Sequence, residues 1–375
     1  MLKRIMTLKN KRLKIIFVLI LTGVTYVLVN QNAFMYHEPV GKIIQAKTIK
    51  KQEVEDNYKN KDLQITQELK IKFLNQNKQR ITLHNTADVS QASGQIYKKG
   101  QKVILQRISQ TWQIMTLKRD ALIVSLMVLF IGLLIVLTRL RASLFLLLSL
   151  GLNLVYFVIA IALNVSFTIP VILLYAMLSF VFAASSLLFV IGANHQMIFT
   201  LLTTVLTTVL TFLITFIVLD LTGNAGIHFE YLDYVTQNPS QFFFVGTMIS
   251  VLGAIMDGTG DIVAGLFGLS RQNQVNHIQL KYKDYVRSGF SIGQEIIGTL
   301  TNVLFMIFMA EAFPICFLLL KNGNTWGYIA TVGLNLGLLQ TIISAIGIVL
   351  AVPVTAFVTS LVLVKQDKER KEDVS

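Results

Sequence analysis

Charge is scarce in this chain of 375 residues, of which only 14% are charged and 54% are hydrophobic. A soluble domain with so few charges would be hard to keep dispersed in water. Cysteine is almost absent as well. The single Cys316 excludes an intramolecular disulfide, and the usual Cys/His metal frameworks are missing. We therefore expect no disulfide scaffold, no metal and no other cofactor.

Long apolar runs take the place of charge. Several reach the roughly 20 residues that a helix needs to cross the hydrocarbon core of a bilayer. Basic residues outnumber acidic ones, 33 to 20, for a net charge of +13. In a membrane protein this excess bears first on loop orientation and on anionic lipid headgroups. No zinc-finger, helix-turn-helix or RNA-binding signature accompanies it, so we expect a protein of the lipid bilayer that binds no nucleic acid.

The N-terminus combines a basic stretch, residues 1–12, with the apolar residues 13–29. This order resembles a signal peptide, but NQNAFMYHE, which follows, offers no convincing cleavage site with small residues. We predict an uncleaved anchor helix over 13–29 with residues 1–12 in the cytoplasm. A cleaved signal is the alternative.

Residues 30–119 are polar and lysine-rich and contain no spanning run. LKIKFLN (69–75) and ITLHN (81–85) alternate apolar and polar residues, and KKGQKVILQRI and TWQIMTL repeat that period of two. The pattern predicts a small extracytoplasmic all-β domain of barrel or sandwich type. Its lysines either contact an anionic cell wall or lipid surface, or form an ordinary solvated face.

A multi-helix membrane domain is predicted over 120–364. Its apolar runs predict spans near 121–138, 143–163, 171–191, 198–219, 242–264, 296–320 and 342–364. The expected fold is therefore an α-helical polytopic membrane protein of about eight transmembrane helices, with the β domain inserted after the first helix.

Basic residues in the short loops predict the orientation. The inner side would hold Arg139, Arg141, Arg271, Lys281, Lys283 and Arg287, together with the charged tail 365–375. Both termini are then cytoplasmic. The last apolar run, 328–364, is longer than one span and too short for two. We expect a re-entrant or interfacial piece over 328–341.

GAIMDGTGDIVAGLFG (253–268) places two aspartates in a run that is otherwise apolar. Asp257 and Asp261 are one helical turn apart, so both carboxylates can point to the same side. Two such charges cannot both ionise cheaply in a low dielectric, and at least one should hold a proton or share a cation. This predicts an ion or proton site. Alternatively, the helix ends near residue 258, and Asp261 lies in a water-filled cytoplasmic vestibule. A further alternative is that Asp257 pairs with a distant basic residue and serves folding only.

SIGQEIIGTLTN (291–302) carries the second group of polar residues. On a helix, Ser291, Glu295, Thr299 and Asn302 form one stripe. Facing the aspartate helix, this stripe would create a hydrophilic path toward the middle of the membrane. Interhelical hydrogen bonding without transport is the alternative.

Other polar patterns suggest less. Thr200, Thr204, Thr208 and Thr211 line one face of the span near 198–219, and we expect them to bond their own backbone one turn earlier. The sequence contains no HExxH and no GxSxG motif. Its two aspartates share one helix, whereas intramembrane aspartyl proteases set their acids on separate helices. We expect no enzyme.

GAIMDGTGDIV, RSGFSIGQEIIGTLTN and AIGIVLAVPVTAF together resemble the core of the YibE/F-like multipass membrane proteins, most strongly over 240–357. The order of anchor, outer β region ending in LKRD, and membrane block is similar to the YibE-type arrangement. The residues of this chain that match the family pattern are Asp257, Ser288, Gly289, Gly293, Glu295, Gly298, Thr299, Asn302 and Pro353.

Two positions depart from that pattern. Gln294 stands where a basic residue usually precedes the acid, which removes a natural partner for Glu295. Asp261 stands where a small or hydroxyl residue is more usual. The resemblance implies a bacterial cytoplasmic-membrane protein and supplies no substrate.

Two functions follow from these observations. The first is a proton- or cation-coupled transporter whose path is lined by Asp257, Asp261, Ser291, Glu295, Thr299 and Asn302. The second is a non-transporting envelope protein whose β domain binds wall, lipid or a partner subunit. A homo-oligomer or a partner membrane subunit is compatible with both.

Overall fold

The computed structural model describes residues 11–76, 79–167, 169–232, 238–276, 278 and 280–372, with side chains up to Gln366. Contacts divide the chain into two compact units, Met1–Ser143 and Leu144–Ser375. Each unit is described by itself.

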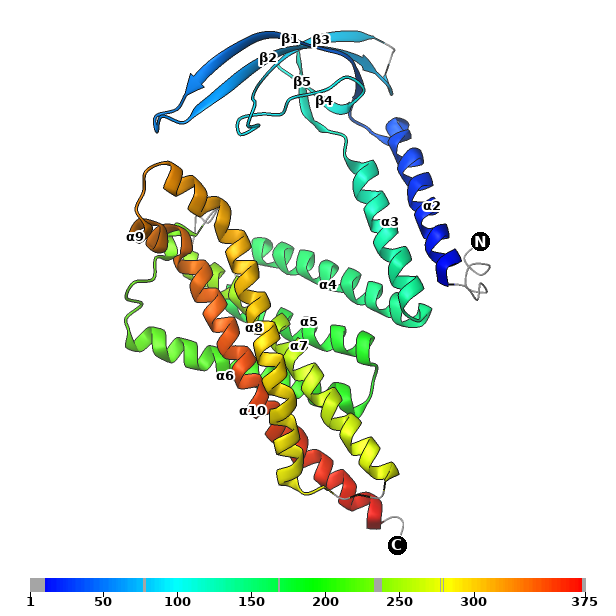
Figure 1. Ribbon diagram of the computed structural model, residues 1–375, viewed down its shortest axis with the longest axis vertical. Helices are drawn as coiled ribbons and strands as arrows, with labels where there is room; N and C mark the ends of the chain where they lie inside the picture. The colour runs from blue at the N-terminus through cyan, green and yellow to red at the C-terminus, as the bar shows by residue number, and fades with distance from the viewer. Residues whose placement is uncertain are drawn as a thin grey trace. The chain divides into compact units, whose positions relative to one another are not determined.

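The first unit contains two apolar helices that lie side by side, α2 (Lys11–Asn30) and α3 (Asp120–Leu137) (Figure 1). Gly132 permits their close approach, because a Cβ at this position would lie 2.6 Å from Val18 Cγ1. The Thr22 hydroxyl donates to the carbonyl of Val18, one turn earlier, so it presents no free polar group to the bilayer. The predicted anchor over 13–29 is confirmed as a helix.

Five antiparallel strands form the sheet that lies between these helices in sequence. They are β1 (Val40–Glu55), β2 (Lys61–Phe73), β3 (Arg80–Asp88), β4 (Lys102–Ile108) and β5 (Thr111–Leu117), in the order β3-β2-β1-β4-β5. The predicted all-β domain is confirmed. It is one open sheet, however, so the expectation of a barrel or a sandwich is wrong.

The sheet curves around a small apolar core. Alternate residues of the strands are buried, among them Ile43, Leu69, Ile71 and Leu105. The Phe73 ring of β2 meets the Trp112 ring of β5 edge-on at 5.1 Å, although two strands separate β2 from β5 in the sheet. Curvature brings these strands together, and the core therefore needs no second sheet.

The second unit is helical. Its elements are α4 (Leu140–Ser166, which begins at the unit boundary), α5 (Val171–Ile191), α6 (His195–Leu221), α7 (Pro239–Val275), α8 (Tyr282–Lys321), α9 (Trp326–Ile329) and α10 (Asn335–Glu372), with a 3-10 turn η2 (Phe229–Tyr231) before α7. In the described parts of the chain, eight helices are long and apolar enough to cross a membrane. The predicted number of spans is confirmed.

Two helices are much longer than the spans predicted near 242–264 and 296–320. α7 has 37 residues and α8 has 40, so each is longer than about 50 Å at about 1.5 Å per residue, against a hydrocarbon core of about 30 Å. Tertiary packing explains the extensions. Tyr285, in the first turn of α8, is fully buried in a cluster with Ile262 and Leu266 of α7 and Leu363 of α10.

The expectation of a re-entrant piece over 328–341, separate from the last span, is wrong, whereas an interfacial position of these residues stays a prediction. α9, a π-helical stretch (Ala330–Leu334) and α10 follow one another, so Trp326–Gln366 is a single candidate span. A π-helical turn accommodates an extra residue without ending a helix, so the chain passes from α9 into α10 without a break.

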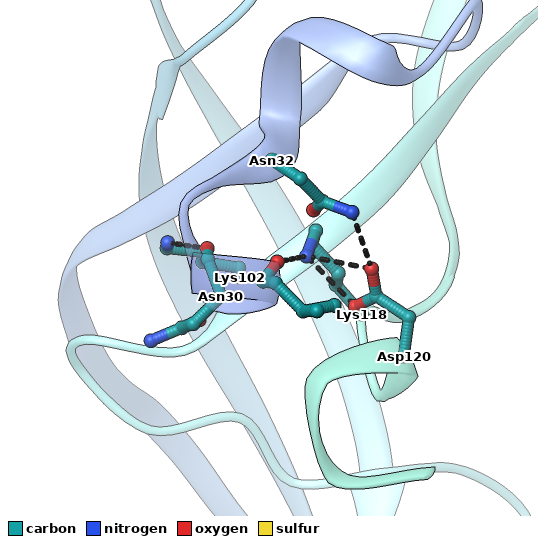
Figure 2. A network of polar contacts seen from close by, with 6 residues as sticks. Asn30, Asn32, Lys102, Lys118 and Asp120 are labelled. Carbon is teal, nitrogen blue, oxygen red and sulfur yellow. Dashed lines mark hydrogen bonds and ion pairs between the residues drawn. The ribbon is translucent and has the colours of Figure 1, made fainter. Parts of the chain in front are cut away.

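A polar network joins the two helices of the first unit to the sheet (Figure 2). Lys118 directly follows β5, and its side chain is only 1% exposed. Its Nζ donates to Asp120 Oδ1 at 2.7 Å and to the Val29 carbonyl at 3.0 Å. Asn32 Nδ2 donates to the same carboxylate at 3.1 Å, and Lys102 donates to the Asn30 carbonyl. Cations thus meet the carbonyl end of α2, and a carboxylate begins α3, as the helix dipoles favour.

Tyr36 also belongs to this network, since its ring lies 5.4 Å from Lys118 Nζ. Burial, then a hydrogen bond to Asp120 and the negative charge of that residue, raise the pKa of Tyr36 to about 12.

Alkaline titration should reveal this shift. A raised pKa means that folding favours the neutral phenol, so its contribution to stability is present below pH 10.0 and is lost as the pH rises toward about 12. The difference in phenolate absorbance between the wild type and Tyr36→Phe reports the ionisation of Tyr36. In the folded protein this difference is expected to appear only near pH 12, and in denaturant near pH 10.0. Ionisation of Tyr36 near pH 10.0 in the folded protein would contradict the network.

Candidate functional site

Asp257 is the middle residue of α7, 18 residues from Pro239 and 18 from Val275. Asp261 lies one turn further along. The helix continues without a break past both aspartates, so the alternative of a helix end near residue 258 is wrong. Both side chains are exposed on the surface of the second unit.

α7 packs against α8 along a row of glycines and isoleucines. A Cβ on Gly258 would lie 3.6 Å from Leu300 and 3.9 Å from Ile296, and a Cβ on Gly265 would lie 2.7 Å from Ile292. Residue numbers rise along α7 as they fall along α8, so the helices are antiparallel. Asp257 is therefore near the depth of Thr299, and Asp261 is near the depth of Glu295.

The polar stripe of α8 lies beside this contact. Ser291, Glu295, Thr299 and Asn302 are all exposed. At about 100° per residue, the stripe lies roughly 100° around α8 from the Ile292–Ile296–Leu300 row. The Thr299 hydroxyl donates to the carbonyls of Glu295 and Ile296 at 3.3 and 3.0 Å.

Contacts with α10 show on which side the polar residues lie. A Cβ on Gly289 of α8 would lie 2.8 Å from Ala356, and one on Gly293 would overlap Val352. On α7, Ile255 contacts α10 at Gly347. The rotation of about 100° per residue then places the polar residues of each helix beyond the α7–α8 contact, on the side away from α10.

The structure therefore brings the six predicted residues to one side of the α7–α8 pair. We call this set the polar face: Asp257, Asp261, Ser291, Glu295, Thr299 and Asn302. Their side chains are exposed rather than enclosed. The polar face is an open surface of the second unit, on which the polar rows of α7 and α8 lie side by side.

The carboxylates of the polar face have no basic partner among the described residues. Neither the Lys118–Asp120 ion pair nor the His228–Glu230 contact, which is an ion pair if the imidazole is protonated, involves them. Structural pairing of Asp257 with a distant base therefore finds no support in the described structure. Acids one turn apart without a cation nearby are suited to share a proton or a small cation.

A second set of polar groups lies inside the helical unit. Thr200, Thr204, Thr208 and Thr211 of α6 are buried, and each hydroxyl donates to a carbonyl one turn earlier at 2.7–2.9 Å. The prediction for these threonines is confirmed. Thr204 additionally meets Thr259 of α7, with 2.7 Å between the hydroxyl oxygens.

The sequence analysis missed the hydroxyls of α10. Thr355, Thr359 and Ser360 are fully buried, and their oxygens have no hydrogen-bond partner in the described structure. The signal was the polar repeat TAFVTS within an apolar run. These groups lie in the packed interior and not on the polar face.

The helical unit also contains cavities. One, of about 370 Å³, is lined by mainly apolar side chains of α5, α6 and α7, with Ser179 and Thr208 among them. The other, of about 620 Å³, is lined by Glu230 and Glu311, with Gly333 of the π-helical stretch. Glu311 and Glu230 are acidic residues that could concentrate cations at one end of α8. Asp233, which the sequence places in the same acidic loop, lies outside the described residues.

The eight apolar helices and the sheet after the first of them define a multipass membrane protein with a small all-β domain. The model of the YibE/F-like protein family matches residues 126–365, and that of the YibE/F family N-terminal domain matches residues 34–118. The chain belongs to the YibE/F family. Neither the curated proteins nor the solved structures yielded a match.

Proposed function

We propose that this protein is a non-enzymatic membrane transporter that moves protons or small cations along the polar face of α7 and α8. One observation carries the proposal: Asp257 and Asp261 lie at matched depths with Thr299 and Glu295, on one side of the helix pair, with no basic partner among the described residues. Acids at membrane depth are costly and are functional candidates for that reason.

The orientation is part of the proposal. With Arg139, Arg141 and the basic α7–α8 connection in the cytoplasm of a bacterial cell, both termini are cytoplasmic and residues 30–119 are extracytoplasmic. The cavity lined by Glu230 and Glu311 would then face the outside and supply cations to the path.

The test is flux into proteoliposomes that contain the purified full chain. We expect a pH gradient to drive proton or monovalent-cation movement that exceeds leakage through protein-free liposomes. Flux equal to that leakage, for protons and for each cation assayed, would contradict the proposal.

A second candidate function rests on β1. Beyond Lys42 this strand pairs with β2 alone, because β4 pairs only with Val40–Lys42. The free edge carries exposed Lys47, Lys50 and Lys51, which suits an anionic wall polymer or lipid surface. Replacing these three lysines with glutamine should leave flux unchanged if transport is the function. Loss of envelope binding without loss of flux would assign the two functions to separate parts of the chain.

A further inference from the structure

We propose that the polar face is a docking surface for a second copy of this chain, and that the acidic site is complete only in the dimer. The inference extends the proposed function and rests on it for the role of the acids. The docking itself is tested without any measurement of flux.

The first argument is the open side of α8. Within the described structure, α8 packs against α7 and α10, and against α9 and the π-helical stretch at one end. On the side away from these contacts, Ser291, Glu295, Thr299 and Asn302 are all exposed. Hydrocarbon can cover apolar side chains, but it offers no partner to Asp257, Asp261 or Glu295. Another polar surface must therefore cover this side of the α7–α8 pair.

Small residues on the same side provide the second argument. Gly253 and Gly268 of α7 lie on the aspartate side, four residues before Asp257 and seven after Asp261, and Gly298 lies within the stripe of α8. Nothing lies within 4 Å of a Cβ built on any of these three glycines. Gly265 and Gly293, by contrast, are already packed against a neighbour. Open small residues let another helix approach closely, as in membrane helix pairs.

The polar face is also a better complement to itself than the other helices of the chain are. In α2 and α3, the hydroxyls of Thr22, Thr25 and Ser125 donate to carbonyls of their own helices. In α4, Asn153 is engaged with Ser185 and Ser186 of α5. The hydroxyl protons of Thr22, Thr25 and Ser125 are therefore already used on their own helices, and the Asn153 amide is bonded within the second unit.

The polar face, however, contains both acceptors and donors. Its acceptors are the carboxylates, and its donors include the Asn302 amide and the Ser291 hydroxyl. A two-fold axis along the membrane normal keeps equal depths in contact, as closed dimers do. The Asn302 amide of one copy then reaches the depth of Asp257 in the other. In this dimer, Asp261 and Glu295 are shielded from lipid and are free to bind protons or cations.

Disulfide cross-linking in native membranes tests the docking. In a Cys316→Ser background, Gly298→Cys places one thiol on the polar face. Leu206→Cys is the matched control, because Leu206 is 46% exposed near the middle of α6, which packs on the opposite side of α7. After mild oxidation, we expect at least ten-fold more disulfide-linked dimer from Gly298→Cys. Equal yields, or a cross-linked product containing a different polypeptide, would overturn the proposal.

A pair of glycine variants provides an independent test that separates docking from folding. Gly298→Leu is expected to leave a folded monomer in nanodiscs, counted by single-molecule photobleaching, because its new side chain meets only open space. Gly293→Leu, which would overlap Val352, should instead lower the yield of folded protein. A dimer that survives Gly298→Leu would overturn the docking surface.

The two proposals fail in different ways. Dimers without flux would contradict the transporter and leave the docking surface standing. Flux from a protein that photobleaches as a monomer would overturn the docking surface and leave the transporter standing.

Discussion

Asp257→Asn is expected to reduce ion flux at least about a hundredfold, the equivalent of roughly 2.7 kcal/mol. Asparagine keeps the size of the side chain but can neither take up and release a proton nor neutralise a cation. Because Asp257 occupies the middle of α7 on the polar face, no other residue at that depth of α7 can replace its carboxylate. The measurement is proteoliposome flux at several pH values, normalised to the amount of inserted protein.

Two further variants sharpen this prediction. Asp220→Asn, an exposed aspartate near the end of α6, is the matched control and should keep full flux. If Asp257 and Asp261 share one proton or cation, the double variant should lose no more flux than Asp257→Asn alone, because residues that act as a unit are not additive. Near-normal flux in Asp257→Asn, with normal insertion, would remove the basis of the transport proposal.

Lys118→Met is expected to destabilise the first unit by about 3 kcal/mol, the lower end of the range for breaking a buried ion pair. The variant keeps an aliphatic chain of similar length but removes the cation that meets Asp120 and the Val29 carbonyl. The Asp120 carboxylate, 22% exposed, is then left with Asn32 and Tyr36. The junction between α2, α3 and the sheet should loosen before the helices themselves unfold.

Trp112 offers a direct readout of that loosening. The chain has two tryptophans, so Trp326→Phe leaves Trp112 as the sole emitter, packed against Phe73 of the sheet. The midpoint of its denaturant-induced emission shift should fall in Lys118→Met. Lys99→Met, which alters an exposed lysine of the same unit, should leave the midpoint in place. Equal midpoints for the two variants would mean that the ion pair does not stabilise the unit.

Local patterns were sufficient for the elements of this fold. Span length is a property of consecutive residues, so the apolar runs predicted eight helices, and the run 171–191 coincides with α5. Period-two alternation predicted strands where β2 and β3 lie. Helical spacing alone placed Asp257 with Asp261 and aligned the stripe of α8, because positions three and four apart share a face. The family resemblance was likewise readable from short motifs and is confirmed.

Long-range contacts decided the rest. Spacing says that Asp257 and Asp261 share a side, but only the contacts of Gly258 with Leu300 and of Gly293 with Val352 show which side of the bundle that is. Alternation also did not show that the strands form one curved sheet, in which Phe73 packs on Trp112 across two strands, rather than a barrel or a sandwich. Lys118 reaches the Val29 carbonyl across 89 positions of sequence. Composition and periodicity determined the helices and strands. Residues far apart in the chain meet only when packing brings their elements together, so the tertiary structure decided what each polar side chain faces.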